Sequence, residues 1–107
     1  MDMKKMKNAE YDFPLADGTT VKTTITFYYL YQLRNKNKSL YERYNKILQN
    51  TKSESFDLLD MVTIVYVGYV CAHISDENIL SEEEFFKLCG SNIEPIAKAV
   101  TALIRPK

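Results

Sequence analysis

One long apolar run constrains the fold of this chain more than any other feature. It extends from Ser55 to Ile74, reads SFDLLDMVTIVYVGYVCAHI, and contains only two aspartates and one histidine as ionisable residues. Its valines, isoleucines and tyrosines are typical of a buried strand. However, the run is about three times the usual strand length, and no turn residue divides it except Gly68. A helix therefore explains the run better than a strand.

The same run carries a helix start signal and has no polar side. Ser55 is placed to cap the helix, and Asp57 would lie in the first turn, where a negative charge suits the positive helix end. A helix that is apolar almost all round is one that other elements surround. We therefore predict a central helix, which other helices enclose. One face would carry Phe56, Leu59, Thr63, Tyr66, Val67, Val70 and Ile74, and the opposite face Leu58, Val62, Val65 and Tyr69.

A membrane span is the main alternative for this run, and its length argues against it. The part without charges, Met61 to Ala72, is shorter than the roughly 20 residues that a bilayer requires. No basic cluster or aromatic belt flanks it. Residues 1–10 contain lysines without a following apolar segment, so they do not resemble a signal peptide. We expect a cytoplasmic protein that does not contact a membrane.

Length and charge limit the class of protein further. A chain of 107 residues predicts one globular domain, residues 10–107, after a flexible arm, residues 1–9. Fourteen basic residues balance fourteen acidic ones, whereas dedicated nucleic-acid binders usually carry a basic excess. The basic residues gather between Arg34 and Lys52, and the acidic ones between Asp76 and Glu84. These two regions could pair within the fold or between copies of the chain.

The segment before the apolar run predicts a β-hairpin and two helices. Alternating apolar residues in Glu10–Thr26 predict two strands that turn at Asp17-Gly18, with Pro14 marking the first strand as an edge. Thr26 is placed to cap a helix over residues 27–35. A capping box of Ser39 and Glu42 predicts a second helix over residues 40–49. Its inward face would be Leu40, Tyr44, Ile47 and Leu48.

Two more helices are predicted after the central one. Ser81 and Glu84 form a second capping box, and Gly90 suits the left-handed end of that helix. Asn92 would cap the last helix, with an inward face of Ile93, Ile96, Ala97, Val100, Leu103 and Ile104. The expected fold is mainly α (α+β): an N-terminal β-hairpin followed by about five helices packed around a central apolar helix.

The sequence offers no set of residues for catalysis or for binding a cofactor. His73 is the only histidine, so a two-histidine metal site is impossible, and we expect it to interact with carbonyls at a helix end. Cys71 and Cys89 are not spaced for a metal site or a disulfide framework, and we expect them to pack as reduced thiols. The three glycines are scattered, so no loop is built to hold phosphate. We expect a protein that is not an enzyme and has no metal or cofactor.

Tyrosine is the unusual component of the composition. Five of the eight tyrosines crowd residues 28–44, interleaved with arginine and lysine: Tyr28, Tyr29, Tyr31, Tyr41 and Tyr44. They could pack along amphipathic helices with their hydroxyls reaching water. They could also form a protein-binding surface, since interface hot spots favour tyrosine and arginine. Single-stranded nucleic acid is a weaker alternative, because the nearby lysines flank a loop rather than a groove. We select Tyr28, Tyr31 and Tyr41 as the candidate protein-binding residues.

Four segments of the sequence, in their order along the chain, resemble a known protein family. The segments are FPLADGTTVKTTIT, FYYLYQLRNKN, FDLLDMVTIVYVGYVCA and SEEEFFKLCG. Over residues 10–95 they are similar to the small tail assembly chaperones of long-tailed phages and prophages of Gram-positive bacteria. The resemblance implies a helical, non-enzymatic protein of the host cytoplasm that coats the tape-measure protein while the tail tube assembles. It implies the tape-measure protein as partner, with the tail-tube protein and further copies of this chain as other candidates.

A small DNA-binding or transcription regulator is the alternative function. It would use Arg43 and Lys46 on the second predicted helix. Such a protein would bind DNA with an affinity that falls steeply as salt rises, whereas a tail assembly chaperone would show no affinity for DNA.

Overall fold

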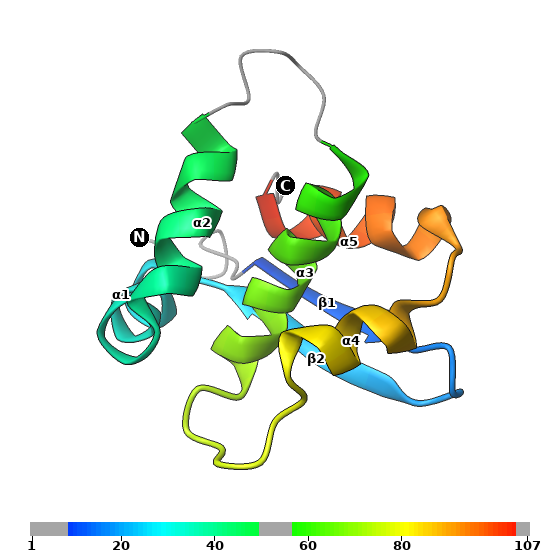
Figure 1. Ribbon diagram of the computed structural model, residues 1–107, viewed down its shortest axis with the longest axis horizontal. Coiled ribbons are helices and arrows are strands. Elements are labelled where there is room, and N and C mark those ends of the chain that lie inside the picture. Colours follow the sequence, from blue (N-terminus) through cyan, green and yellow to red (C-terminus); the bar gives the residue numbers. More distant parts are fainter. Residues whose placement is uncertain (1–8, 50–56, 105–107) are drawn as a thin grey trace, which may run out of the picture.

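The computed structural model of this chain describes residues 9–49 and 57–104, and it shows a hairpin followed by five helices. Figure 1 shows these elements in chain order. The described elements are β1 (Ala9–Pro14), β2 (Thr20–Ile25), α1 (Phe27–Lys36), α2 (Lys38–Gln49), α3 (Leu58–Ala72), α4 (Glu82–Cys89) and α5 (Ile93–Ile104). The predicted fold class, a mainly helical α+β fold with an N-terminal hairpin, is confirmed. Residues 1–8 of the predicted arm lie outside the described part.

The hairpin forms at the predicted turn. Strands β1 and β2 pair antiparallel, with Tyr11 opposite Thr23 and Phe13 opposite Val21. Asp17 accepts hydrogen bonds from the Thr19 backbone N–H (3.0 Å) and from the Thr19 hydroxyl (2.7 Å), and these bonds lower the pKa of Asp17. Gly18 has a φ of 94°, a conformation that glycine adopts at little cost. The local sequence LADGT thus determines where the chain reverses.

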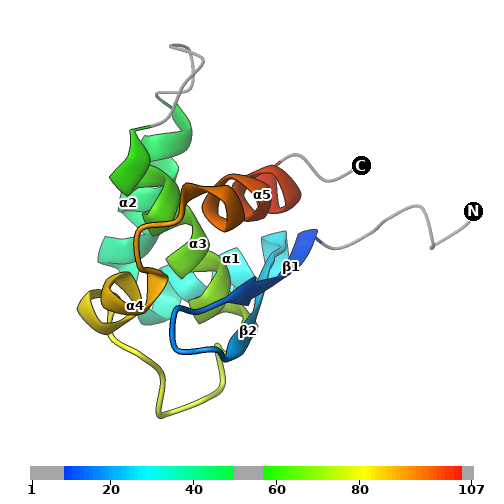
Figure 2. The same cartoon turned by 90° about the vertical axis from the view of Figure 1, so that its right-hand side faces the viewer.

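Helix α3 forms the centre of the molecule, as predicted. Every residue from Val62 to Cys71 is buried, on all sides of the helix. Figure 2 shows α3 between the hairpin on one side and α2 and α4 on the other, with α5 above. The predicted cap Ser55 lies outside the described residues. The described helix begins at Leu58 after Asp57, whose side chain makes no capping hydrogen bond.

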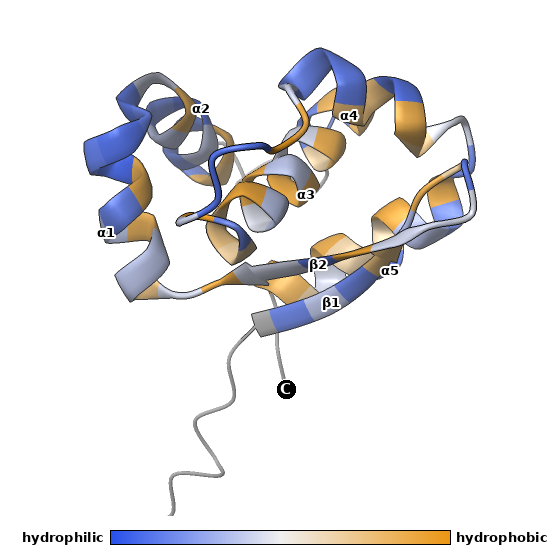
Figure 3. Cartoon of the chain, turned by 90° about the horizontal axis from the view of Figure 1, so that it is seen from below, coloured by the Kyte–Doolittle hydropathy of each residue, from blue (hydrophilic) through white to orange (hydrophobic). Residues whose placement is uncertain are grey.

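The hairpin, and not only other helices, encloses α3. Helix α3 packs mainly on β2, while α5 packs on β1 and also contacts α3. The inner face of the hairpin carries buried side chains, among them Phe13, Thr23 and Ile25. The hydrophobic colours in Figure 3 gather along α3 and α5 above and behind this face. The prediction that helices surround the central helix was therefore incomplete, because a sheet face covers one side of it.

The start of α2 differs from the prediction. The helix begins at Lys38, and Asn37 caps it by accepting a hydrogen bond from the Leu40 N–H at 3.2 Å. Asn37 also ends α1, since its N–H donates to the Leu33 carbonyl at 2.7 Å. The predicted capping box of Ser39 and Glu42 is wrong because both residues lie inside α2. The predicted inward face is confirmed, with Leu40, Tyr44 and Ile47 buried and Leu48 partly buried.

We expect Asn37→Ala to lower the free energy of unfolding by about 1 kcal/mol, because the Leu40 N–H loses its acceptor. The matched control is Ser39→Ala, which changes an exposed residue inside the helix and should leave stability unchanged or slightly raised. Urea unfolding followed by circular dichroism measures both variants. Equal losses for the two variants would show that Asn37 does not cap α2.

The buried side of α5 also differs from the prediction. Its buried residues are Ile96, Ala99, Val100 and Leu103, which repeat at helical spacing. Ile93 and Ala97 were predicted to face inward, yet Ala97 is exposed and Ile93 is 54% exposed. Two neighbouring apolar stripes run along this helix, and only one of them meets β1 and α3. Periodicity identified the helix and three of its buried residues, Ile96, Val100 and Leu103, but it wrongly included Ile93 and Ala97.

Candidate protein-binding surface

A ridge of exposed aromatic side chains runs along α1. Phe27 is 92% exposed, Tyr28 63% and Tyr31 56%, and all three lie within the first five residues of the helix. Leu33 is the only buried residue of α1, with Tyr29 and Leu30 partly buried beside it. We call Phe27, Tyr28 and Tyr31 the α1 ridge. The helix therefore presents aromatic groups to solvent and only a narrow side to the core.

Local contacts hold the ridge in place. The Thr26 hydroxyl caps α1 by accepting a hydrogen bond from the Tyr29 N–H at 3.2 Å. Gln32 Nε2 donates to the Tyr28 hydroxyl at 3.0 Å, one turn along the helix. The guanidinium carbon of Arg34 lies 5.8 Å from the centre of the Tyr31 ring, within the range of a cation–π contact. These contacts limit side-chain motion, which reduces the entropy that a binding partner would have to overcome.

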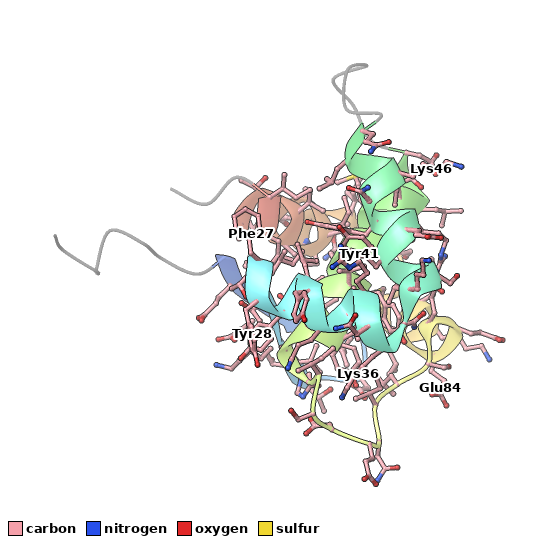
Figure 4. The ribbon with its side chains drawn as sticks, turned by 90° about the vertical axis from the view of Figure 1, so that its left-hand side faces the viewer. Phe27, Tyr28, Lys36, Tyr41, Lys46 and Glu84 are labelled. Atoms are coloured by element: carbon pink, nitrogen blue, oxygen red, sulfur yellow. The ribbon has the colours of Figure 1, made fainter. Side chains whose placement is uncertain are left out.

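The structure brings together two of the three residues selected from the sequence. Tyr28 and Tyr31 share the exposed ridge, whereas Tyr41 lies on α2 and is partly buried against the core. Figure 4 shows Phe27 and Tyr28 near the start of α1 and Tyr41 on the neighbouring helix. Phe27 was not selected, although an aromatic residue directly after the cap Thr26 can point away from the core. The candidate surface therefore consists of Phe27, Tyr28 and Tyr31. Tyr41 is not part of it.

Three other tyrosines have structural roles, which explains part of the tyrosine surplus. Tyr66 and Tyr69 on α3 hold the backbone of Leu80 from both sides: Tyr66 donates to its carbonyl and Tyr69 accepts from its N–H, each at 2.9 Å. Burial raises the pKa of Tyr66, with a further contribution from the Glu82 carboxylate. Burial also raises the pKa of Tyr44 to about 12. The hydroxyls of Tyr44 and Tyr66 therefore stay protonated at neutral pH, and all three side chains serve the fold.

The oppositely charged regions meet within the chain. Arg43 on α2 forms a two-bond ion pair with Glu82 on α4, with distances of 3.0 and 2.6 Å. These hydrogen bonds raise the pKa of Arg43. Lys36 donates to the Ile74 carbonyl at 2.5 Å and so connects the end of α1 to the loop after α3. Two cations of the basic region are thus engaged inside the molecule.

The histidine forms the pair of groups that most resembles a catalytic arrangement. His73 Nδ1 lies 2.8 Å from an Asp76 carboxylate oxygen, and the ring packs on Tyr69 with centres 4.9 Å apart. Its other nitrogen, Nε2, is buried without a hydrogen-bond partner among the described residues. A base must reach its substrate, and this nitrogen does not reach solvent. The His73 backbone N–H donates to the Tyr69 and Val70 carbonyls at the end of α3, whereas its side chain pairs with Asp76 and not with helix carbonyls.

The thiols lie in apolar surroundings. Burial raises the pKa of Cys71 to about 12 and that of Cys89 to about 11. At neutral pH both remain protonated, and a protonated thiol is a poor nucleophile and a poor metal ligand. Within residues 9–49 and 57–104, no cluster of three or more histidine, cysteine, aspartate or glutamate side chains could hold a metal ion. In the same ranges, none of the helices has the length and apolarity that a membrane crossing needs.

The comparisons with known proteins give no relative. No protein-family model matches this chain, and neither the curated proteins nor the solved structures contain a match. The geometry of the α1 ridge is therefore the basis on which a function can be argued.

Proposed function

We propose that this protein is a tail assembly chaperone of a long-tailed phage or prophage, which binds the tape-measure protein in the host cytoplasm during assembly of the tail tube. The observation that supports this proposal is the α1 ridge of Phe27, Tyr28 and Tyr31. The resemblance of residues 10–95 to that chaperone family supplies the identity of the client. Further copies of the chain and the tail-tube protein are the other partners that the resemblance implies.

The ridge has the size and composition of a binding site. At about 200 Å² for each aromatic side chain, the exposed parts of the three residues amount to roughly 400 Å². The largest apolar patch on a typical monomer has this size and is often functional. Tyrosine is also enriched among the residues that dominate binding energy at interfaces. A contact with a client chain would remove this apolar surface from water.

The fold can tolerate changes at the ridge, which makes a direct test possible. The packed core consists of residues from all seven elements, and α1 contributes Leu33 to its buried part. Removing an exposed aromatic ring from α1 therefore leaves the core contacts intact. A loss of binding in such a variant can be separated from a loss of folding.

The test is binding of the tape-measure protein of the same phage or prophage, measured by co-purification and by titration. We expect the Tyr28→Ser/Tyr31→Ser variant to bind at least about 30-fold more weakly, the effect of losing a hot spot. The matched control is Ile93→Ser, which removes an apolar side chain of similar exposure from α5. If the tape-measure protein does not bind the unaltered chain, the proposed function is wrong. If it binds the double variant as well as the control, the site is wrong.

The alternative function, a DNA-binding regulator, has no comparable observation in its favour. It requires Arg43 and Lys46 to contact phosphates, but the Arg43 guanidinium already pairs with both oxygens of Glu82. Lys46 is exposed on α2 (Figure 4). A single exposed lysine is a weak basis for DNA affinity, which depends on several phosphate contacts.

A further inference from the structure

The charged residues of α1 itself are all of one sign. Helix α1 carries Arg34 and Lys36 in its last turn and has no acidic residue between Phe27 and Lys36. Lys36 is already bound to the Ile74 carbonyl. Arg34 makes no ion pair with any described residue, and it lies on the same side of the helix as Phe27 and Tyr31. The ridge therefore combines exposed aromatic rings with one available cation.

Arg34 is held in a position that suits a carboxylate. Its guanidinium lies over the Tyr31 ring, with the carbon 5.8 Å from the ring centre. A cation–π contact of this kind does not use the N–H groups of the guanidinium for hydrogen bonds to a carboxylate, so they stay available. These N–H groups form a fork that binds both oxygens of a carboxylate. A partner with an acidic residue beside its apolar residues would match both parts of the surface.

The backbone of α1 indicates that the partner segment is a helix. An extended peptide gains affinity by hydrogen-bonding to an exposed strand edge. From Tyr29 onward, the amides of α1 are bonded to Thr26 or within the helix, so most of the ridge offers an extended peptide no such partners. An extended segment lying on the aromatic rings would lose hydrogen bonds to water. A helical segment satisfies its own backbone and can pack its side chains between those of the ridge.

Two other possible partners, a second copy of the chain and a single-stranded nucleic acid, fit the α1 ridge less well. A second copy of the chain that met this ridge with its own α1 would bring further cations and no anion. A single-stranded nucleic acid would use the aromatic rings for stacking, but its backbone requires a row of cations. Arg34 alone does not form such a row.

We propose that the α1 ridge binds an amphipathic helix with acidic residues beside its apolar face, and that Arg34 pairs with one of these acids. The choice of the α1 ridge as the binding site rests on the proposed function. The acidic, helical character of the partner goes beyond that function. Phe27 and Arg34 are seven residues apart on one side of α1, a distance of about 10 Å along the helix. The acid of the partner would therefore lie about two turns from the apolar residue that contacts Phe27.

The experiment uses the full chain and two synthetic peptides. Both peptides are 18-residue helices with leucine at helical spacing, one with glutamates beside the leucines and one with lysines at the same positions. Fluorescence anisotropy measures their affinities at 50 mM and 300 mM salt. We expect the acidic peptide to bind at least about tenfold more tightly at low salt, and this preference to shrink at high salt as screening increases. Arg34→Gln should reduce the preference to less than threefold.

The matched control is Lys98→Gln, which removes one positive charge from an exposed position on α5 and should keep the preference. Equal affinity for the two peptides, or equal effects of Arg34→Gln and Lys98→Gln, would overturn the proposal. So would tighter binding of a dT20 oligonucleotide than of the acidic peptide, which would assign the ridge to nucleic acid. None of these results depends on the tape-measure protein. If that protein fails to bind while the acidic preference holds, only the proposed function is wrong.

Discussion

A Phe85→Ala variant is expected to lose about 3–5 kcal/mol of unfolding free energy, the range for removing a buried phenylalanine. Phe85 on α4 is fully buried and lies against three other rings. Its ring centre is 5.9 Å from that of Phe13 and 5.3 Å from those of Tyr66 and Tyr69. Alanine would leave a cavity between α3, α4 and the hairpin. A loss of this size is a large part of the stability of a small domain.

The matched control for Phe85 is its neighbour in the same helix. Phe86 is only partly buried, so Phe86→Ala should cost clearly less. Thermal and urea unfolding, followed by circular dichroism, measure both variants. If the two substitutions cost the same, the aromatic cluster around Phe85 is not the anchor of α4.

A Gly68→Val variant is expected to lose about 2–3 kcal/mol, because the position is already filled by its neighbours. A Cβ atom at Gly68 would lie 2.9 Å from the end of the Leu103 side chain and 3.1 Å from the Thr23 Cβ. The Leu103 methyl group can move. The Thr23 Cβ is fixed to the backbone of β2, so β2 itself would have to move away from α3. The glycine therefore sets the distance between the central helix and the hairpin.

The control for Gly68 introduces the same side chain into another helix. Ala97 is exposed on α5, so Ala97→Val should cost only the difference in helix propensity, at most about 0.7 kcal/mol. Urea unfolding compares the two variants with the unaltered protein. A Gly68→Val variant as stable as Ala97→Val would mean that α3 and β2 are not in close contact at this point.

Local signals in the sequence were sufficient to predict most of the elements. The hairpin follows from Asp17-Gly18 between alternating apolar residues, and α4 follows from the Ser81 and Glu84 capping box, which the structure confirms. Helix α3 was recognisable because a run without a polar side must be buried. In each of these cases, neighbouring residues carry the physical cause.

The sequence alone could not identify the cap of α2 or the buried side of α5, because contacts between residues far apart in the chain determine both. Both Asn37 and Ser39 are good helix caps, and the choice depends on where α1 ends. On α5, the predicted face included Ile96, which is buried, and Ile93, which is exposed, and only the contact with β1 and α3 separates the two. Such choices depend on tertiary packing, which periodicity does not report.

The prediction of the candidate surface was only partly correct, because side-chain exposure also depends on tertiary packing. The tyrosine surplus pointed to α1, where Tyr28 and Tyr31 are indeed exposed, but it also pointed to Tyr41, which is partly buried. Phe27 is the most exposed large apolar side chain among the described residues, yet a phenylalanine at a helix start looks like a core residue in a sequence. Only the direction in which α1 leaves the hairpin shows that Phe27 points to solvent.

Site-specific crosslinking from position 27 tests the central claim most directly. Phe27 is replaced with the photoreactive analogue p-benzoylphenylalanine, and the protein is irradiated together with its proposed client, the tape-measure protein of the same phage or prophage. The same analogue in place of Ile93, another exposed apolar residue, serves as the control. A crosslink to the tape-measure protein from position 27 and none from position 93 is the result that a client-binding α1 ridge predicts. A crosslink from position 93 and none from position 27 would contradict it.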